Sequence, residues 1–373
     1  MVDADKVGNS RATYIVFLMG VLLLIAAGSL LPQNARGNSC PYTVRCKHSE
    51  AFSVESLSSS CTIFTAAIGD TVLFGNNEDY PLHGTFLWLM PAQYVQLPSE
   101  TIPIHGAIFF GFDANDHPVD GYPQGGMNDQ GLCCDGNGLP DAPLNPHPER
   151  ETPYAYPFYQ ILWECGTVND TIAWFESHYV GTSLPGQFHF ADASGDAVVV
   201  SAGSDGELAY TRIGNATRLV STNFNLANPS NGDYPCNRYL SACSLLDEIG
   251  SEAGLTIETC RDILAAVHQD GVTAYSNIFN PVTGDIYIYQ NHDFSTVVEL
   301  NLDEELERVV PGAEGVVSET PLLVKAIRIG SLFALPAGSL IGSLLLVGGV
   351  FAGILVIGGG VMYYRRKSKG QLK

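Results

Sequence analysis

The segment Cys61-Thr-Ile-Phe-Thr-Ala-Ala-Ile-Gly-Asp-Thr-Val-Leu-Phe-Gly-Asn-Asn-Glu-Asp79 decides how this chain is expected to fold. Strand-forming residues at 62–68 and 72–74 flank the short turn Gly69-Asp-Thr71, which predicts a β-hairpin. The far end of the second strand of a hairpin lies beside the start of the first. We therefore expect Asp79 to lie close to Cys61, although the two are distant in sequence. A thiol at the start of a strand with a carboxylate beside it is not easily explained by packing, so the segment predicts a reactive site.

Outside this hairpin the sequence alternates between short strand-like runs and a few helical ones. Strands are expected at 188–191, 197–200, 219–222, 275–279 and 286–290. Helices are expected at 156–165, 168–178 (capped by Asn169 and Asp170), 237–249 and 256–268. Hairpins at both ends with helices between them favour an α+β layered arrangement over alternating βαβ units. Residues 61–311 are interpreted as one domain, and 312–335 as a stalk.

Two apolar segments lie near the ends of the chain. Residues 14–31 follow a short segment that carries Lys6 and Arg11, so 1–35 are predicted to be a signal peptide or a signal anchor. Residues 336–364 contain no charged residue and are long enough for a transmembrane helix. The basic tail at 365–373 is expected to stay in the cytoplasm, which places the domain outside the cell membrane.

Composition excludes several classes of function. The chain has 39 acidic and 18 basic residues, so it offers no positive face to a nucleic acid. No Cys-x-x-Cys occurs and the 9 histidines show no ligand spacing, so neither a metal nor another cofactor is predicted. In an oxidising compartment most of the 9 cysteines are expected to pair, and their odd number leaves at least one thiol over.

Cys61 is the cysteine whose surroundings indicate chemistry. A free thiol has a pKa of about 8.5 and needs a base, and a free α-amine with a pKa of about 7.7 to 8.0 is suited to that task. A cysteine at the first position of a mature chain carries nucleophile and base on one α-carbon. The serine-rich connector at 36–60 precedes Cys61, and we expect the Ser60–Cys61 bond to be broken by the Cys61 thiol itself, removing that propeptide.

Four sequence blocks in order resemble the choloylglycine hydrolase and penicillin V acylase family. The first is Cys61-Thr followed by Leu73-Phe-Gly-x-Asn-x-Asp79, and the others are Gly125-Gly-Met-Asn-Asp-Gln-Gly-Leu132, Val220-Ser-Thr-Asn223 and Cys236-Asn-Arg-Tyr239. The resemblance extends over about 61–306. It implies a four-layer αββα sandwich of the cysteine N-terminal-nucleophile (Ntn) hydrolases, which cut linear carbon–nitrogen amide bonds of small-molecule substrates.

The resemblance also implies roles for individual residues. Cys61 is expected to be the nucleophile and, through its amine, the base. Asp79 is expected to orient that amine, Asn223 to donate to the oxyanion, and Arg238 to support the electrostatics of the centre. Loss of one oxyanion donor costs on the order of 100-fold in rate.

One departure from the family concerns the residue after Gly75. Bile salt hydrolases and penicillin V acylases usually have an arginine there, and this chain has Asn76, which cannot stabilise a thiolate as a charge would. Asn76, Asn77 and Asn137 remain candidates for substrate or oxyanion contacts.

Other functions share many of these residues. The ending Asn77-Glu78-Asp79 is similar to that of the cysteine dipeptidases of the same superfamily, so a peptidase acting on short peptides is an alternative. An acyltransferase that uses an amine instead of water would need the same residues. A membrane-anchored surface binding protein that retains the fold without activity is the non-enzymatic alternative.

Overall fold

The computed structural model describes residues 61–80, 84–112, 123–230, 232, 234–309, 317–318 and 325–333. The predicted signal segment, propeptide, transmembrane helix and basic tail lie outside these residues. In the part of the chain that is described, no helix is both long and apolar enough to span a membrane.

The described strands form two large sheets, in which all neighbours are antiparallel, and one small sheet. The six-stranded sheet has the order β12-β1-β2-β13-β14-β15. Its strands are β1 (Thr62–Ile68), β2 (Thr71–Asp79), β12 (Arg218–Ser221), β13 (Thr273–Asn280), β14 (Asp285–Gln290) and β15 (Asp293–Asn301).

The eight-stranded sheet has the order β11-β10-β9-β8-β7-β6-β3-β17. Its strands are β3 (Thr85–Met90), β6 (Ala107–Phe112), β7 (Pro123–Asn128), β8 (Cys133–Pro143), β9 (Ser183–Ala191), β10 (Ala197–Ala202), β11 (Leu208–Arg212) and β17 (Lys325–Arg328). The small sheet joins β4 (Gln93–Gln96), β5 (Thr101–Ile104) and β16 (Val317–Ser318).

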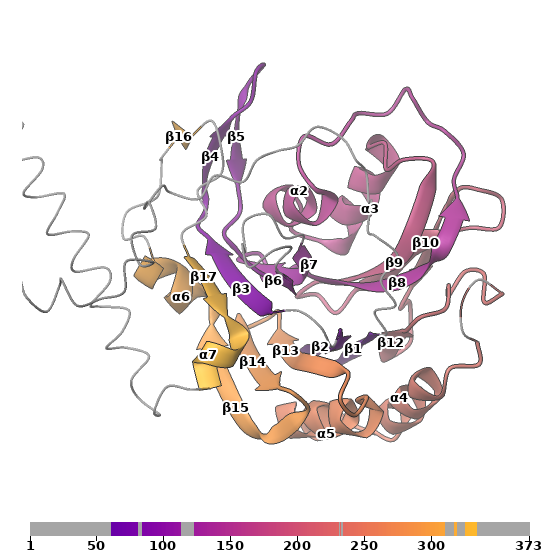
Figure 1. Ribbon diagram of the computed structural model, residues 1–373, viewed down its shortest axis with the longest axis vertical. Coiled ribbons are helices and arrows are strands. Elements are labelled where there is room, and N and C mark those ends of the chain that lie inside the picture. Colours follow the sequence, from indigo (N-terminus) through magenta and orange to yellow (C-terminus); the bar gives the residue numbers. More distant parts are fainter. Residues whose placement is uncertain are drawn as a thin grey trace, which may run out of the picture. The chain divides into compact units, whose positions relative to one another are not determined.

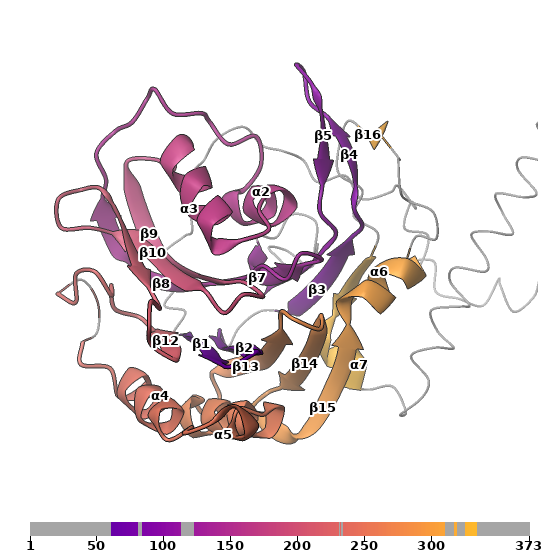
Figure 2. The same ribbon diagram turned by 180° about the vertical axis from the view of Figure 1, so that it is seen from behind.

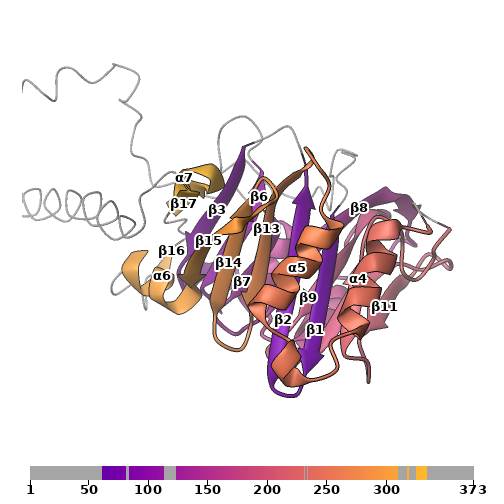
Figure 3. The ribbon, with the colours of Figure 1, turned by 90° about the horizontal axis from the view of Figure 1, so that it is seen from below.

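Helices cover the outer face of each large sheet, which gives four layers (Figures 1 and 2). One outer layer holds α2 (Pro157–Glu164) and α3 (Val168–Ser177), against the eight-stranded sheet. The other holds α4 (Asn237–Asp247) and α5 (Ile257–Val267), which lie across β1, β2 and β13 in Figure 3. The short helices η2 (Glu252–Gly254, a 3-10 helix), α6 (Leu302–Val309) and α7 (Ile329–Phe333) complete the described helices.

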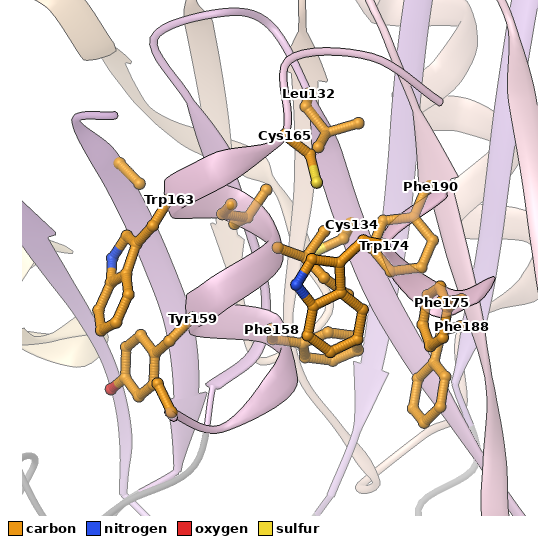
Figure 4. Close-up of a cluster of buried hydrophobic side chains, with 14 of the residues drawn as sticks. Leu132, Cys134, Phe158, Tyr159, Trp163, Cys165, Trp174, Phe175, Phe188 and Phe190 are labelled. Carbon is orange, nitrogen blue, oxygen red and sulfur yellow. The ribbon is translucent and has the colours of Figure 1, made fainter. Parts of the chain in front are cut away.

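Three apolar clusters separate these layers. The cluster between the sheets takes Ile63 and Phe74 from one sheet and Phe110 and Cys133 from the other. The cluster under α2 and α3 is rich in aromatic side chains (Figure 4), including Phe158, Trp163, Trp174, Phe175, Phe188 and Phe190. The layer order agrees with the predicted αββα sandwich.

The predicted elements are largely present. The hairpin at Gly69 is confirmed, with Gly69 at φ 63°, and the strands expected at 188–191 and 197–200 are present in β9 and β10, which pair with each other. The four predicted helices agree with α2, α3, α4 and α5 within a few residues. The cap of α3 differs, because Thr167 is the N-cap residue and its hydroxyl accepts a hydrogen bond from the backbone N–H of Asp170.

The expected stalk at 312–335 requires correction. Strand β17 pairs with β3 at the edge of the eight-stranded sheet, with Ile327 opposite Leu87. Helix α7 then places Ile329 and Leu332 in the core between the sheets. Part of the segment assigned to a stalk therefore belongs to the folded domain.

The cysteines also differ from expectation. The seven described cysteines are all free and buried: Cys61, Cys133, Cys134, Cys165, Cys236, Cys243 and Cys260. Cys133 and Cys134 point to opposite faces of β8, the first into the core between the sheets and the second toward α2 and α3. Both pack as small apolar side chains.

Candidate functional site

Cys61 lies directly before β1 in the middle of the six-stranded sheet. Ile63 pairs with Asn76 across the hairpin, so alternation along the strands puts Cys61 opposite Glu78, on the face that Ile63 turns toward the other sheet. The thiol is almost fully buried there, at 1% exposure. Its position is set by the pairing of β1 with β2, which are both interior strands of the sheet.

The backbone carbonyl of Cys61 is held from two directions. Asn137 of β8 donates its side-chain amide to this oxygen at 3.2 Å. Arg238, in the first turn of α4, donates to the same oxygen at 2.9 Å and to the hydroxyl of Thr62 at 2.8 Å. The residue that carries the thiol is thus fixed by both sheets and by an outer helix.

Arg238 connects the other predicted residues. It donates to the side-chain oxygen of Asn223 at 2.9 Å and forms an ion pair with Asp79 at 3.6 Å. Asn223 in turn donates its amide to the carbonyl oxygen of Gly138 in β8 at 2.9 Å. The structure therefore brings Cys61, Asp79, Asn223 and Arg238 into one connected group.

Asp79 is buried on the helix side of β2, the opposite face from the thiol. Its carboxylate accepts hydrogen bonds from Gln269, at 2.6 Å, and from Thr273, in addition to the ion pair with Arg238. Burial raises the pKa of Asp79 to about 6, and its hydrogen bonds and Arg238 oppose that rise. The carboxylate is held firmly in one orientation.

Glu78 is the side chain that meets the thiol. The Cys61 Sγ donates a hydrogen bond to Glu78 Oε1 at 3.3 Å, and Glu78 is fully buried. Burial raises the pKa of Glu78 to about 8. Burial, and then the charges of Glu78, Asp79 and Asp135, raise the pKa of the Cys61 thiol well above its usual value. In the uncut chain the thiol is therefore neutral.

A second carboxylate lies on the same face. Asp135 comes two residues after Cys133 in β8 and therefore also points between the sheets. Burial and the charge of Glu78 raise its pKa well above the usual range. A side chain at Gly125 would collide with it, since an added Cβ would lie 2.4 Å from the Asp135 carboxylate. Gly125 of the second sequence block thus makes room for an acid.

Several polar atoms around the thiol lack hydrogen-bond partners. Among the described residues, these buried atoms include the side-chain oxygens Asn76 Oδ1, Glu78 Oε2 and Asn137 Oδ1, the Tyr275 hydroxyl and the Asn277 amide nitrogen. Buried polar atoms normally have partners, and each exception requires an explanation. Both acceptors and donors are among these atoms, so the surroundings of the thiol offer hydrogen-bonding groups of either kind.

The turn that carries Asn223 is held by Gln187 of β9. The Gln187 amide donates to the carbonyl oxygens of Thr222, at 2.7 Å, and Phe224, at 2.8 Å. Its oxygen accepts from the backbone N–H of Leu226 at 3.1 Å. Because Gln187 is buried and fully engaged, it fixes the backbone on both sides of Asn223.

The other sequence candidates have distinct positions. Asn76 lies on the thiol's face of β2 and contacts Asn277 at 3.4 Å. Asn77 lies on the opposite face, where it donates to Leu264 O of α5 at 2.9 Å and accepts from Ser276 at 2.6 Å. Asn76 and Asn137 are therefore close to the thiol, whereas Asn77 connects the sheet to α5.

Sequence reasoning missed Glu78 and Asp135. The signal for Glu78 was present, because counting back across the hairpin pairs position 78, not 79, with position 61. No local signal marked Asp135, since its place opposite β2 depends on how the two sheets pack.

The second block, around Asn128, is explained by architecture. Asn128 donates its side-chain amide to Leu162 O at 2.9 Å and to Cys165 O at 2.8 Å, at the end of α2. Its oxygen accepts from the backbone N–H groups of Gln130 and Leu132. This asparagine closes a turn and caps a helix; it does not reach the thiol's face by any of these contacts.

A cavity of about 380 Å3 lies beside the connected group of Cys61, Asp79, Asn223 and Arg238. Thr273, which binds Asp79, lines it together with Tyr80, Gln290, His292 and Arg328. Its wall therefore includes Arg328 from β17, at the end of the described chain.

No family model matches the chain, and no curated protein sequence matches it. Solved structures are similar to it at low identity. A mutant of the conjugated bile acid hydrolase from Clostridium perfringens has 14% identity and a TM-score of 0.49, and covers 65% of this chain and 93% of its own. The penicillin V acylase from Agrobacterium tumefaciens has 15% identity and a TM-score of 0.49, covering 65% and 87%. An ortholog of N-acylethanolamine-hydrolyzing acid amidase from Caenorhabditis elegans has 14% identity and a TM-score of 0.41, covering 60% and 93%.

Proposed function

We propose that this protein is a self-processing amidase that hydrolyses a linear carbon–nitrogen amide bond with Cys61 as its N-terminal nucleophile. The observation that carries the proposal is the connected group around Cys61. Arg238 binds the Cys61 carbonyl, Asn223 and Asp79 at once, so residues from β2, α4 and the turn after β12 are connected to the residue that carries the thiol. A packing role alone does not require this convergence.

Each residue has a proposed role in the mature enzyme. The freed α-amine of Cys61 takes the thiol proton, and the thiolate attacks the substrate carbonyl. Asn223, whose side-chain amide also binds Gly138 O, is assigned as a donor to the oxyanion. Arg238 and Asp79 hold the N-terminal residue in position, and water then hydrolyses the acyl-enzyme.

The decisive test is the intact mass and N-terminal sequence of the expressed full chain beside a Cys61→Ala variant. The proposal expects the wild-type chain to begin at Cys61 and the variant to keep Ser60 and the residues before it. Cleaved enzyme is then assayed for amine release from N-acyl amino acids and N-acyl amines. If both proteins remain uncut when folded, the thiol has no α-amine, and the surface binding-protein alternative is favoured.

The two acidic side chains beside the thiol favour one class of amide substrate. Glu78 and Asp135 both lie on the face of the thiol, where the related families usually place an arginine at position 76. A protonated amine placed beside these two acids favours their ionised forms, which attract it, whereas a substrate carboxylate keeps them neutral. A peptidase acting on short peptides with a free ammonium group is therefore the second candidate.

A matched substrate pair separates the two candidates. The dipeptidase-like proposal expects faster hydrolysis of an alanyl amide with a free ammonium group than of the same amide with an acetylated nitrogen. A reversed preference supports the N-acyl amidase instead.

We further propose, from the sequence alone, that residues 336–364 anchor the enzyme in the cell membrane with the domain outside. The apolar run and the basic residues behind it support this arrangement. A tag placed after Lys373 is expected to be protected from added protease in intact cells, while the domain is digested. Digestion of both in intact cells contradicts the proposed orientation.

A further inference from the structure

Self-cleavage raises a chemical problem that the mature mechanism does not solve. Before the cut, the nitrogen of Cys61 is part of a peptide bond, and an amide nitrogen is not a base. The α-amine therefore cannot activate the thiol that is proposed to free it. Another group must take the thiol proton in the uncut chain.

Glu78 is placed for this task. In the uncut chain its Oε1 accepts the hydrogen bond of the Cys61 thiol at 3.3 Å. The contact lies one step beyond the paired positions Thr62 and Asn77 of β1 and β2, so strand pairing sets the approach of the two groups. A base must lie within hydrogen-bond reach of the proton that it takes, and Glu78 meets this condition.

Among the described residues the thiol donates its hydrogen bond to Glu78, and two other ionisable groups nearby are engaged elsewhere. The Asp79 carboxylate binds Thr273, Gln269 and Arg238 on the opposite face of β2. His189, between the sheets, binds the hydroxyls of Thr65 and Ser221 at 2.9 and 3.0 Å, and burial lowers its pKa to about 3.

Burial also gives Glu78 a suitable basicity. An ordinary carboxylate, with a pKa of about 4.3, is a weak base toward a thiol. Burial raises the pKa of Glu78 to about 8, and its Oε2 has no partner among the described residues. When ionised, this carboxylate is therefore a stronger base than a solvated one, and it has a strong tendency to take a proton.

We propose that Glu78 is the base of self-cleavage, taking the Cys61 thiol proton in the uncut chain, and that the freed α-amine replaces it afterwards. This inference rests on the proposed function. The S–H bond breaks and its proton passes to Glu78, while Sγ bonds to the carbonyl carbon of the preceding residue. The C–N bond then breaks, and Glu78 returns the proton to the departing nitrogen, leaving a thioester and a free amine. Water hydrolyses the thioester to a carboxylic acid and the Cys61 thiol.

The charges that face Glu78 set the expected pH dependence. On the thiol's face these groups are Cys61, Asp135 of β8 and Tyr275 of β13, and beyond the sheet lie Asp79 and Arg238. Glu78 acts as a base only when ionised, which occurs above its pKa of about 8. The rate of self-cleavage is therefore expected to rise as pH increases from 6 through about 8.

The test follows the conversion of newly synthesised full chain to the shorter product on a gel, between pH 6 and pH 9. Wild type, Cys61→Ala, Glu78→Gln and Asp135→Asn are compared. Glu78→Gln is expected to cut at least about 100-fold more slowly, the usual contribution of a general base. Asp135→Asn leaves the thiol contact, and because burial and the charge of Glu78 keep Asp135 protonated while Glu78 ionises, it is expected to cut with a nearly unchanged pH dependence.

A second arm separates self-cleavage from catalysis. A recognition sequence for a site-specific protease is placed directly before Cys61 in full-length wild type and Glu78→Gln, so that the protease exposes Cys61. The opened Glu78→Gln enzyme is expected to keep the pH dependence of kcat/KM that opened wild type shows on an N-acyl substrate, because the α-amine is now the base in both enzymes. Inactive opened Glu78→Gln beside active opened wild type overturns the inference, since Glu78 would then act in both states or only in folding.

The remaining outcomes are also decisive. If Glu78→Gln cuts as fast as wild type, or if the wild-type rate is flat or falls between pH 6 and pH 9, the inference is wrong while the proposed function stands. The wild-type pH profile decides the question even if the variant does not fold. If wild type remains uncut at every pH, the proposed function itself fails.

Discussion

Arg238 is the residue on which the arrangement of the site depends most. It is the cation that touches the Cys61 carbonyl, and it also orders Asn223 and pairs with Asp79. Its side chain is 16% exposed, so its charge acts in a largely desolvated site. The planar guanidinium makes these contacts in different directions, which the point charge of a lysine does not reproduce.

Replacement of Arg238 is expected to abolish most of the activity. Arg238→Ala leaves Asn223 without its partner and Asp79 without its cation, so kcat/KM of protease-opened enzyme should fall on the order of 100-fold or more. Arg238→Lys should recover little of this loss. Arg261→Ala is the matched control, because Arg261 pairs with the adjacent, exposed Asp262. Equal activities of Arg238→Ala and the control would contradict the role given to Arg238.

At the scale of elements, the hairpin was predictable from sequence and the rest of the site was not. Strand-forming residues and a glycine turn are local features of a sequence, so the strand expected at 62–68 agrees with β1 in full. Strands β3 and β6 were missed because TFLWLM and AIFFGF are buried on both faces, which removes the alternation that marks a strand. The meeting of Asn223 with Arg238 depends on a long turn, and only the resemblance to a family indicated it.

The turn after β12 gives a prediction about positioning. Gln187→Leu removes the donors that hold Thr222 O and Phe224 O, while keeping a side chain of similar size. The unpaired carbonyls should lower the free energy of unfolding by about 1–3 kcal/mol. Because the backbone around Asn223 is released, kcat should fall more than KM changes. Urea unfolding and steady-state kinetics measure the two effects. Gln96→Leu, at an exposed position of β4, is the control; a Gln187→Leu enzyme with unchanged kcat would show that the turn holds itself.

The edge strand β17 gives a second prediction at this scale. A chain ending after residue 311 loses the partner of β3 and the two buried side chains Ile329 and Leu332. Burial of such a side chain contributes about 1.5–3 kcal/mol, and an uncovered apolar edge promotes aggregation. The chain ending after residue 335 should therefore be monodisperse in size-exclusion chromatography and unfold at higher urea. If the chain ending at 311 is equally stable, β17 is dispensable.

At the scale of the whole molecule, two kinds of buried group make the free energy of unfolding depend on pH in opposite directions. The folded pKa values of Glu78 and Asp79, about 8 and about 6, lie above their ordinary values, so the folded state binds more protons. Their stabilising effect is fully present below about pH 4 and is lost as pH rises toward 8. His189 has a folded pKa of about 3, so its contribution is present above about pH 6.5 and is lost as pH falls.

These opposing effects predict a maximum of stability in mildly acidic solution. The free energy of unfolding of uncut Cys61→Ala protein, measured in urea from pH 3 to pH 9, should be greatest near pH 4, because above that pH the two carboxyl groups lose more stabilisation than His189 gains. Adding Glu78→Gln should flatten the decline on the alkaline side, because a neutral amide has no proton to lose. Adding His189→Phe should instead flatten the decline on the acidic side. A stability that rises steadily to pH 8 in the Cys61→Ala protein would mean that Glu78 is not held protonated between the sheets, and it would also remove the basis for its raised basicity toward the thiol.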